Sequence, residues 1–223
     1  MNTPVLNGGA EKSITYFRPK NSMSNLSEGD FDPNPFVQFR KWFEAAHNAR
    51  LHLPEAVALA TATPEGKPSV RMVLLRGLDE RGFVFFTNYE SRKGIELVAN
   101  PHAALMFYWG ELERQVRIEG SVERISSGES DEYFRRRPWG SRISAWVSPQ
   151  SRVIPNREVL ETAYQELLAE YPEENIPRPP HWGGFRVIPT IVEFWQGGPN
   201  RLHDRLCYRL SEDGSWVIER LAP

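Results

Sequence analysis

The sequence contains one cysteine, Cys207, among 223 residues. A single thiol cannot form a disulfide within the chain, which excludes the cysteine-stapled folds of small secreted proteins. We therefore expect a protein that works in the reducing cytoplasm. Leu206 and Tyr208 flank the thiol in a strand-like pattern, so Cys207 is interpreted as a small packed residue rather than a nucleophile.

Long hydrophobic runs are also missing. No apolar stretch is long enough to span a bilayer, and we expect no secretory signal segment at the N-terminus. The charge is nearly balanced, with 27 basic and 29 acidic residues and a formal net charge of -2. Because extended nucleic-acid surfaces need an excess of basic residues, neither a membrane nor a nucleic acid is expected as a partner. Any anion-binding site must be a local cluster of cations.

Three common site motifs are absent from the sequence. No Gly-x-Gly-x-x-Gly fingerprint is present, which disfavours a Rossmann domain. No Gly-x-Ser-x-Gly motif is present either, so a serine hydrolase has no support. Four histidines, at positions 47, 52, 102 and 181, are scattered without metal-ligand spacing and no Cys/His cluster exists, so we expect no metal site.

The sequence does contain a series of short apolar strands separated by turn residues. We expect strands at 55–62, 69–76, 83–87, 103–109, 113–125, 184–188, 190–195, 205–210 and 216–220. Helices are expected from Pro35 (capped by Asp32 or Asn34), after Ser91, and at 131–136, 141–147 and 157–170. The last helix, capped by Asn156, is expected to bury Val159, Leu160, Ala163, Tyr164, Leu167 and Leu168.

This order of elements predicts a mainly β protein with helical insertions. The strands do not alternate with helices as βαβ units, and an antiparallel Greek-key barrel is the best match. We divide the chain into a mobile N-terminal arm, residues 1–31, and one domain, residues 32–223.

Cationic side chains gather in the loop that follows Gly197-Gly198-Pro199. Arg201, His203 and Arg205 fall within five residues, and the preceding turn exposes them. Arginine suits phosphate or carboxylate, and histidine exchanges protons near neutral pH. We interpret the loop as part of an anion-binding reaction site.

Two further segments place cations beside an apolar strand and at a helix start. Arg71 and Arg76 bracket the strand. Because they are five positions apart, their side chains would point to opposite faces of it. They either bind anions or only solvate the ends of the strand. Arg92 and Lys93 open a helix whose unpaired N–H groups suit a phosphate. Cations at a helix start oppose the helix dipole, so they would be mildly unfavourable there without a bound anion. We therefore weigh a phosphate site and an ordinary solvated helix start about equally.

Hydroxyl and amide groups complete the candidate sites. Tyr133, Arg137 and Ser141 are spaced four apart, so on a straight or bent helix they would present two hydroxyls and a guanidinium to a second phosphate. The alternative is a polar surface face with Tyr133 packed. The Gln150-Ser151 pair is readable as an ordinary loop. Gln115 is either part of a solvated strand face or a buried amide that hydrogen-bonds the ring edge of a heterocycle such as a flavin.

Taken in order, these motifs resemble those of the pyridoxine/pyridoxamine 5′-phosphate oxidase family. The resemblance spans about residues 32–223, and it depends on several segments recurring in sequence order rather than on any one of them. The segments are Arg71–Leu75, Phe86–Asn88, Ser91–Lys93, Glu113–Val116, Ala145–Ser148, Trp182–Arg186, Phe194–Gly198, Arg201–Arg205 and Glu219–Pro223.

The resemblance implies a split-barrel, FMN-binding fold and a homodimer with the flavin at the interface. The residues implied to contact FMN are Arg71, Met72, Val73, Leu74, Leu75, Arg76, Phe86, Thr87, Arg92, Lys93, Gln115, Gln150, Ser151, Trp195 and Arg205. Those implied to bind the substrate are Arg76, Tyr133, Arg137, Ser141, Arg201, Leu202 and His203. Arg201 and His203 would lie against the pyridine ring as the catalytic residues.

The resemblance also implies a reaction: FMN-dependent oxidation of pyridoxine or pyridoxamine 5′-phosphate to pyridoxal 5′-phosphate, with O2 as electron acceptor and hydrogen peroxide as product. Two positions depart from the family. It usually has lysine where this chain has Arg76, and it often places an arginine and a tyrosine in the arm where this chain has Arg18 and Asn21. The alternatives are a pyridoxal-phosphate or flavin binding protein without turnover, and a flavoenzyme that uses another reductant.

Overall fold

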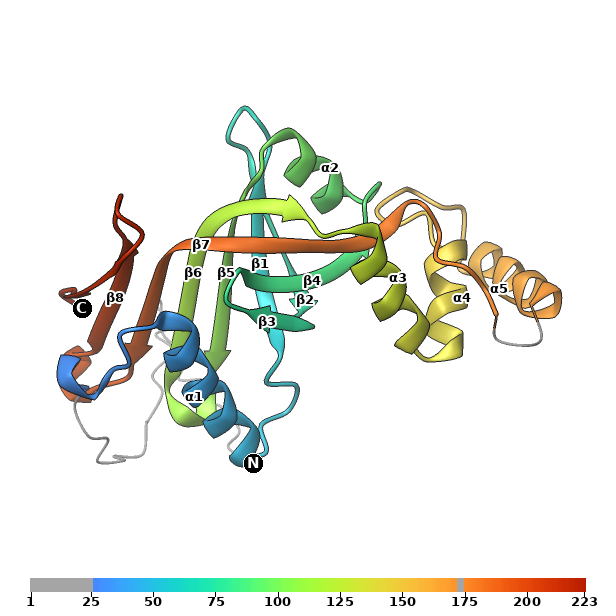
Figure 1. Cartoon of the computed structure of the whole chain (residues 1–223). Coiled ribbons are helices and arrows are strands. Elements are labelled where there is room, and N and C mark those ends of the chain that lie inside the picture. The colour runs from blue at the N-terminus through green and yellow to red at the C-terminus, as the bar shows by residue number, and fades with distance from the viewer. Residues whose placement is uncertain (1–25, 172–174) are drawn as a thin grey trace, which may run out of the picture.

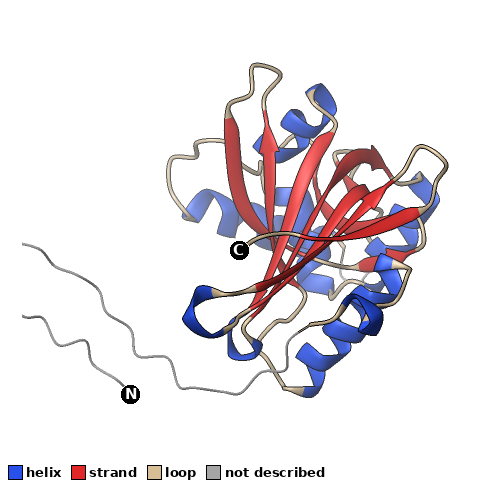
Figure 2. Cartoon of the chain, turned by 90° about the vertical axis from the view of Figure 1, so that its left-hand side faces the viewer, coloured by secondary structure: helices blue, strands red, loops and turns tan. Residues whose placement is uncertain are grey.

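A computed structural model of the chain describes residues 26–171 and 175–223. Its strands form one curled sheet in which every pairing is antiparallel (Figures 1 and 2). The strands are β1 (Ala56–Ala62), β2 (Pro68–Leu74), β3 (Gly77–Asp79), β4 (Gly82–Asn88), β5 (His102–Trp109), β6 (Arg114–Arg124), β7 (Trp182–Gln196), β8 (Asp204–Leu210) and β9 (Trp216–Arg220). The predicted class, mainly β with helical insertions, is confirmed.

Helices occupy the connections between strands. They are α1 (Pro35–Asn48), α2 (Arg92–Ala99), α3 (Ser127–Arg136), α4 (Trp139–Val147) and α5 (Glu158–Glu170), with short 3-10 turns η1 (Glu28–Asp30), η2 (Gly110–Leu112) and η3 (Pro199–Arg201). The segment containing α3, α4 and α5 is inserted between β6 and β7, and these helices gather at one end of the sheet (Figure 1). None of the helices in the described part of the chain has the length and apolar character needed to cross a bilayer.

The long strand β7 organises the sheet. It pairs with β6 along almost its whole length, with β4 over its first half and with β8 over its second half. The prediction of two strands broken at Pro189 was wrong, because the chain continues as one strand through that proline. The register with β6 shifts between Glu119 and Gly120, and a side chain at Gly120 would collide with the Ile188 carbonyl. Glycine therefore lets the two strands cross closely where the sheet bends.

Helix α1 fills the inside of the curled sheet. Asn34 caps it by accepting a hydrogen bond from the Phe36 backbone N–H at 2.8 Å. Of the two caps predicted, Asp32 and Asn34, the structure has Asn34. Phe39 is fully buried, with ring centroids 5.0 Å from those of Phe83 on β4 and Phe107 on β5. The helical spacing of aromatic residues read from the sequence thus builds the main core.

A second, smaller core lies beneath α3 and α4. Phe134, Ile143, Ile176 and Trp182 are its buried members. Helix α5 contributes less than predicted: no residue of it is buried, and Val159 is exposed. The apolar stripe of α5 is present, but this helix packs mainly against one neighbour, α4, so the stripe is only partly covered. The Asn156 side chain does accept a hydrogen bond from the Val159 backbone at 3.2 Å.

Several predicted boundaries move, among them the starts of α3, α4 and β7, and two of the changes affect predicted site residues or the arm. Strand β2 ends at Leu74 rather than Arg76, so Arg76 lies in the link to β3 and the argument from strand parity does not apply to it. Residues 26–31, predicted as the end of the arm, contact the last strands: the Arg220 Nε donates to Glu28 at 2.7 Å. The rest of the arm, with Arg18 and Asn21, lies outside the described residues and stays a prediction.

A buried arginine ties α3 to the hairpin formed by β3 and β4. Arg186 on β7 is only 2% exposed, and it bonds Asp79 of that hairpin and Glu129 of α3, the latter at 3.2 Å. Glu129 also completes the capping box of α3 with Ser126. Arg186 therefore fixes the start of the helix that leads to Tyr133.

Replacing Arg186 by methionine should lower the free energy of unfolding by about 2 kcal/mol, because Asp79 and Glu129 lose their charge-assisted hydrogen bonds to a buried guanidinium. The matched control is Arg81→Met, since the exposed Arg81 contacts the same two carboxylates and should cost less than about 1 kcal/mol. Denaturant unfolding monitored by tryptophan fluorescence measures both values. Equal losses in the two variants would contradict the role given to burial.

Candidate active site

The cavity that gathers most of the predicted residues has a volume of about 680 Å³ and opens where β2 and β4 meet α3 and α4. It is lined by Met72, Val73, Leu74, Arg76, Phe86, Thr87, Asn88, Lys93, Tyr133, Arg136, Arg137, Pro138, Ser141, Gln150 and Trp182. Residues predicted for the cofactor and for the substrate phosphate therefore share one space. The most distant of these predicted residues, Met72 and Gln150, are separated in the sequence by about a third of the chain.

Tyr133, Arg137 and Ser141 converge although no single helix carries them. Helix α3 ends at Arg136, Arg137 is its C-cap, and Ser141 lies in α4. The bend at Pro138 turns the second helix so that all three side chains line the cavity. Tyr133 is also packed, with its ring stacked 3.8 Å from that of Phe86. Both interpretations of this tyrosine, packing residue and site residue, are compatible with its position.

Arg137 is a partly buried cation without a carboxylate partner among the described residues. Its guanidinium carbon lies 4.5 Å above the Trp182 ring, and its Nη1 atom is buried with no hydrogen-bond acceptor. Burial lowers the pKa of Arg137 below its usual range; the Tyr133 hydroxyl opposes this shift, and the nearby charge of Arg76 adds to it. A partly buried, unpaired guanidinium beside a second arginine is an environment that an incoming anion would stabilise.

Lys93 forms a second cationic point in the same cavity. Its Nζ atom lies 3.2 Å from the Thr87 hydroxyl and 3.0 Å from the Gln150 side-chain oxygen. No carboxylate of the described residues lies within 4.0 Å of it. Burial, and next the charge of Arg71, lowers the pKa of Lys93. The ammonium group is thus held by neutral acceptors, which leaves its charge available to an anion.

The remaining cations of this region surround one carboxylate. Arg71 on β2 and Arg92 at the start of α2 both donate to Glu96, at 3.3 and 2.8 Å. Arg92 and Ser151 line an adjoining cavity of about 890 Å³, which shares Gln150 with the first. Arg92 and Ser151 therefore lie on the other side of Gln150 from the main cavity.

The side chain of Leu75, predicted for the cofactor, lies away from the cavities. Leu75 is buried in the main core, where its side chain packs, and only its backbone could face a ligand. Its neighbours Met72, Val73 and Leu74 do line the main cavity.

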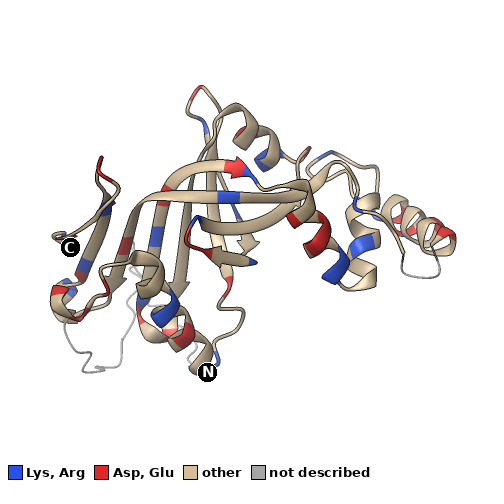
Figure 3. Cartoon of the chain, viewed as in Figure 1, with Lys and Arg blue, Asp and Glu red and all other residues tan. Residues whose placement is uncertain are grey.

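A second group of predicted residues lies on β6, β7 and β8. Trp195 is paired in register with Gln115 on one side and with Arg205 on the other, so the three form one row across the sheet. Arg205 bonds both oxygens of Glu193, at 2.8 and 3.1 Å. Basic and acidic residues are interspersed along these strands (Figure 3), so the row is not part of a continuous basic surface.

The loop after β7 holds its histidine in a defined state. The Gly198 backbone N–H donates to the His203 Nδ1 at 3.1 Å, so the neutral ring carries its proton on Nε2. The rings of Trp195 and His203 lie 4.7 Å apart. Arg201 is exposed and has a positive φ of 64°. The loop thus presents a guanidinium and an imidazole N–H outward.

Within one chain, the two groups of predicted residues do not meet. Leu202 and His203 line a separate cavity of about 440 Å³ with the last residues of the chain. Strand β8 and its loop lie at the end of the sheet opposite to α3 and α4 (Figure 1). The prediction that Arg201 and His203 share a site with Arg137 therefore requires a second copy of the chain.

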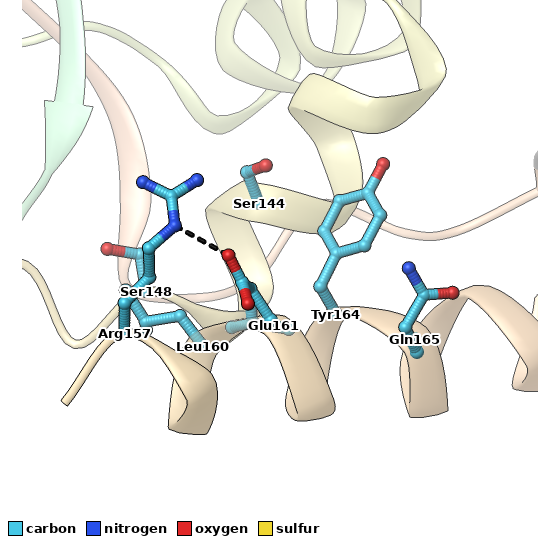
Figure 4. A pocket seen from close by; sticks show the side chains of 8 residues that line it. Ser144, Ser148, Arg157, Leu160, Glu161, Tyr164 and Gln165 are labelled. Carbon is cyan, nitrogen blue, oxygen red and sulfur yellow. Dashed lines mark hydrogen bonds and ion pairs between the residues drawn. The ribbon is translucent and has the colours of Figure 1, made fainter.

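A further cavity of about 460 Å³ lies between α4 and α5 (Figure 4). Leu160 and Tyr164 of α5 face Ser144 of α4 across it, and Arg157 and Glu161 pair at its edge at 2.5 Å. None of the predicted site residues lines this cavity.

Sequence reasoning missed three residues of the site. Trp182 provides the aromatic surface under Arg137, Asn88 lines the cavity and donates to the Ser148 carbonyl at 3.3 Å, and Glu96 joins two arginines. Asn88 and Trp182 lie in segments that carry the family resemblance but were not assigned to the site. Glu96 had a signal in the helix periodicity, because Arg92 precedes it by four residues on the same helix face.

The fold and the site define a class of protein: a split-barrel protein with cation-lined cavities. A structure of a pyridoxamine 5′-phosphate oxidase-related, FMN binding protein from Nostoc punctiforme has the same fold, with a TM-score of 0.66 at 21% identity over 83% of this chain and 97% of that one. The family model described as pyridoxamine 5′-phosphate oxidase matches residues 43–170, and the model of the pyridoxine 5′-phosphate oxidase C-terminal dimerisation region matches residues 182–223.

The chain belongs to the pyridoxamine 5′-phosphate oxidase family. It is 59% identical over 213 residues to the pyridoxine/pyridoxamine 5′-phosphate oxidase of Gloeothece citriformis, covering 96% of this chain and 100% of that one. It is 59% identical over 211 residues to the protein of the same name from Paraburkholderia phymatum, covering 95% and 99%. The structure of PhzG from Burkholderia lata, in complex with tetrahydrophenazine-1-carboxylic acid, gives a TM-score of 0.85 at 34% identity, covering 91% and 100%. The family assignment confirms the prediction of an oxidoreductase with FMN as cofactor.

Proposed function

We propose that the protein oxidises pyridoxine 5′-phosphate or pyridoxamine 5′-phosphate to pyridoxal 5′-phosphate, with O2 as electron acceptor and hydrogen peroxide as product. One observation carries this proposal: a single cavity contains two separate cationic points, at Lys93 and at Arg137, that have no carboxylate partner in the described part of the chain. A reaction between a phosphorylated cofactor and a phosphorylated substrate needs two such points. A binding protein without turnover needs only one of them.

The residues around Lys93 fit the phosphate end of FMN. Arg71, Arg92 and Lys93 would hold the phosphate, with Thr87, Gln150 and Ser151 along the chain that links it to the ring. When bound, FMN supplies the chemistry: it accepts a hydride from the 4′ carbon of the substrate and passes the electrons to O2. The backbone of β2 and the side chains of Met72 and Leu74 would form the wall against the ring.

The residues around Arg137 fit the substrate phosphate. Tyr133, Arg137 and Ser141 would bind it, and Arg76 would add a second cation from the link between β2 and β3. Among the described residues the one carboxylate near Arg76 is the distant Glu55 at 3.8 Å, so the guanidinium could turn toward an anion. Holding the phosphate far from the reacting carbon uses binding energy to orient that carbon.

The reacting end of the substrate would be met by Arg201 and His203 of a second copy. Arg201 would orient the 4′ substituent through its charge, and the His203 Nε2 proton would be available to the pyridine ring or its substituent. A homodimer is supported by the matched dimerisation region. It is also supported by exposed apolar side chains, Met72 on β2 with Met106 and Tyr108 on β5, along one face of the sheet.

We also propose a cytoplasmic location. The one cysteine, Cys207, is buried in β8, and a thiol that packs as a small apolar group is suited to a reducing environment.

The test is anaerobic mixing of the FMN-loaded protein with each phosphorylated vitamer. We expect the yellow flavin absorbance to bleach within one turnover and to return, with hydrogen peroxide, when O2 is admitted. Unphosphorylated pyridoxine at the same concentration is the control and should bleach far more slowly. Bleaching with neither vitamer would overturn the proposal, and bleaching only with a reduced phenazine carboxylic acid would favour the activity suggested by PhzG.

A further inference from the structure

Glu96 is a buried carboxylate behind the region assigned to the FMN phosphate. It lies on α2 and is 5% exposed. One of its oxygens accepts from the Arg92 Nε at 2.8 Å, and the other accepts from Ser69 at 2.6 Å and from Thr61. The Arg71 Nη2 lies 3.3 Å from that second oxygen. The carboxylate thus joins one helix to two neighbouring strands.

This carboxylate stays charged. Although burial opposes its ionisation, the four hydrogen-bond donors around it lower the pKa of Glu96 to about 2. Its negative charge is therefore a fixed part of the site at any pH at which the protein works.

Glu96 holds Arg92 in a way that leaves donors free, whereas both terminal nitrogens of Arg71 are bonded within the protein. Arg92 is bonded through Nε alone, and its two terminal nitrogens have no acceptor within the described residues. Its side chain is 60% exposed and lines the adjoining cavity. With Arg71, Arg92 and Lys93 positive and Glu96 negative, the cluster has two positive charges in excess. A phosphate monoester carries about -1.5 to -2 at neutral pH, so the excess matches it.

We propose that Glu96 is a positioning residue that orients Arg92 toward the phosphate of FMN and fixes the charge of Arg71 behind it. The proposal rests on the assignment of FMN to this site. Two effects of Glu96 oppose each other. Its charge repels the phosphate, whereas its hydrogen bonds fix two long side chains that would otherwise lose rotamer freedom on binding. The fixing of the two side chains outweighs the repulsion of the phosphate.

The sign of the change in affinity separates the two effects. Glu96→Gln removes one negative charge but keeps the size of the side chain. If Glu96 acts mainly through its charge, FMN should bind more tightly to the variant. If it positions the arginines, FMN should bind about tenfold more weakly, and riboflavin, which lacks the phosphate, should bind with unchanged affinity. Titration of the flavin-free protein, followed by quenching of flavin fluorescence, measures both constants.

Glu90→Gln is the matched control, because Glu90 is an exposed carboxylate that pairs with Arg152 beside the same cavity. It removes the same charge and should change the FMN affinity by less than about twofold. Ser69→Ala is a second test that leaves every charge in place and removes one donor to Glu96; we expect a loss of about threefold for FMN alone.

The outcomes are distinguishable. An unchanged or increased preference for FMN over riboflavin in Glu96→Gln overturns the positioning role. Equal weakening of FMN and riboflavin also overturns it, because that result indicates general damage to the site. If the unaltered protein binds FMN no more tightly than riboflavin, the phosphate assignment itself fails, and Glu96 is not the cause.

Discussion

Replacing Arg201 by alanine should lower the turnover number by on the order of 100-fold, because a preorganised charge at the reacting carbon is lost. The affinity for FMN should change by less than about twofold. Arg201 is exposed in η3 and has no carboxylate of the described residues within 4.0 Å, so no fold-stabilising ion pair is broken. Turnover is measured at saturating pyridoxine 5′-phosphate and FMN affinity by fluorescence titration.

Arg209→Ala controls for the loss of a cation from the same part of the molecule. Arg209 lies on β8 and pairs with Glu219 at 2.8 Å, away from the Arg201 loop. It should leave turnover within about twofold of the unaltered enzyme. Equal turnover in Arg201→Ala and the unaltered enzyme would remove Arg201 from the reaction, and an equal fall in FMN affinity would make it a cofactor ligand instead.

Much of the fold could be predicted from the sequence because local signals agreed with the tertiary structure. The aromatic spacing after Pro35 gave α1, and the alternating strands gave the antiparallel sheet. Prediction failed where a tertiary feature overrode the local one. Pro189 reads as a break, but Gly120 on the partner strand accommodates it and β7 continues. The apolar stripe of α5 reads as buried, yet it has a neighbour on one side only.

The site was less predictable because its residues depend on contacts far apart in the sequence. The spacing of Tyr133, Arg137 and Ser141 suggested that they share one face of a helix. They come together instead because the chain bends at Pro138 between two helices, which the periodicity of a single helix does not predict. Trp182 begins a segment that carries the family resemblance, but nothing in the sequence places its ring under Arg137. The separation of Arg201 from Arg137 is a property of the folded chain, and only the three-dimensional structure shows that one copy cannot join them.

That separation leads to a second prediction, which combines two substitutions in one dimer. Arg137→Ala and Arg201→Ala should each inactivate the homodimer, because every site then lacks one of the two residues. A heterodimer of the two variants should recover activity. In a two-fold symmetric dimer, one of its sites contains both substitutions and the other contains neither, so the purified heterodimer should have about half the activity of the unaltered enzyme.

The most direct test of the shared site is therefore the activity of that heterodimer. The two variants, each with a different affinity tag, are co-expressed and purified through both tags, and oxidation of pyridoxine 5′-phosphate is measured per dimer. The homodimer of each variant, purified in the same way, sets the baseline. Recovery to about half of the unaltered activity is the expected result. A heterodimer as inactive as its two parents would contradict the account, because each chain would then supply Arg137 and Arg201 to the same site.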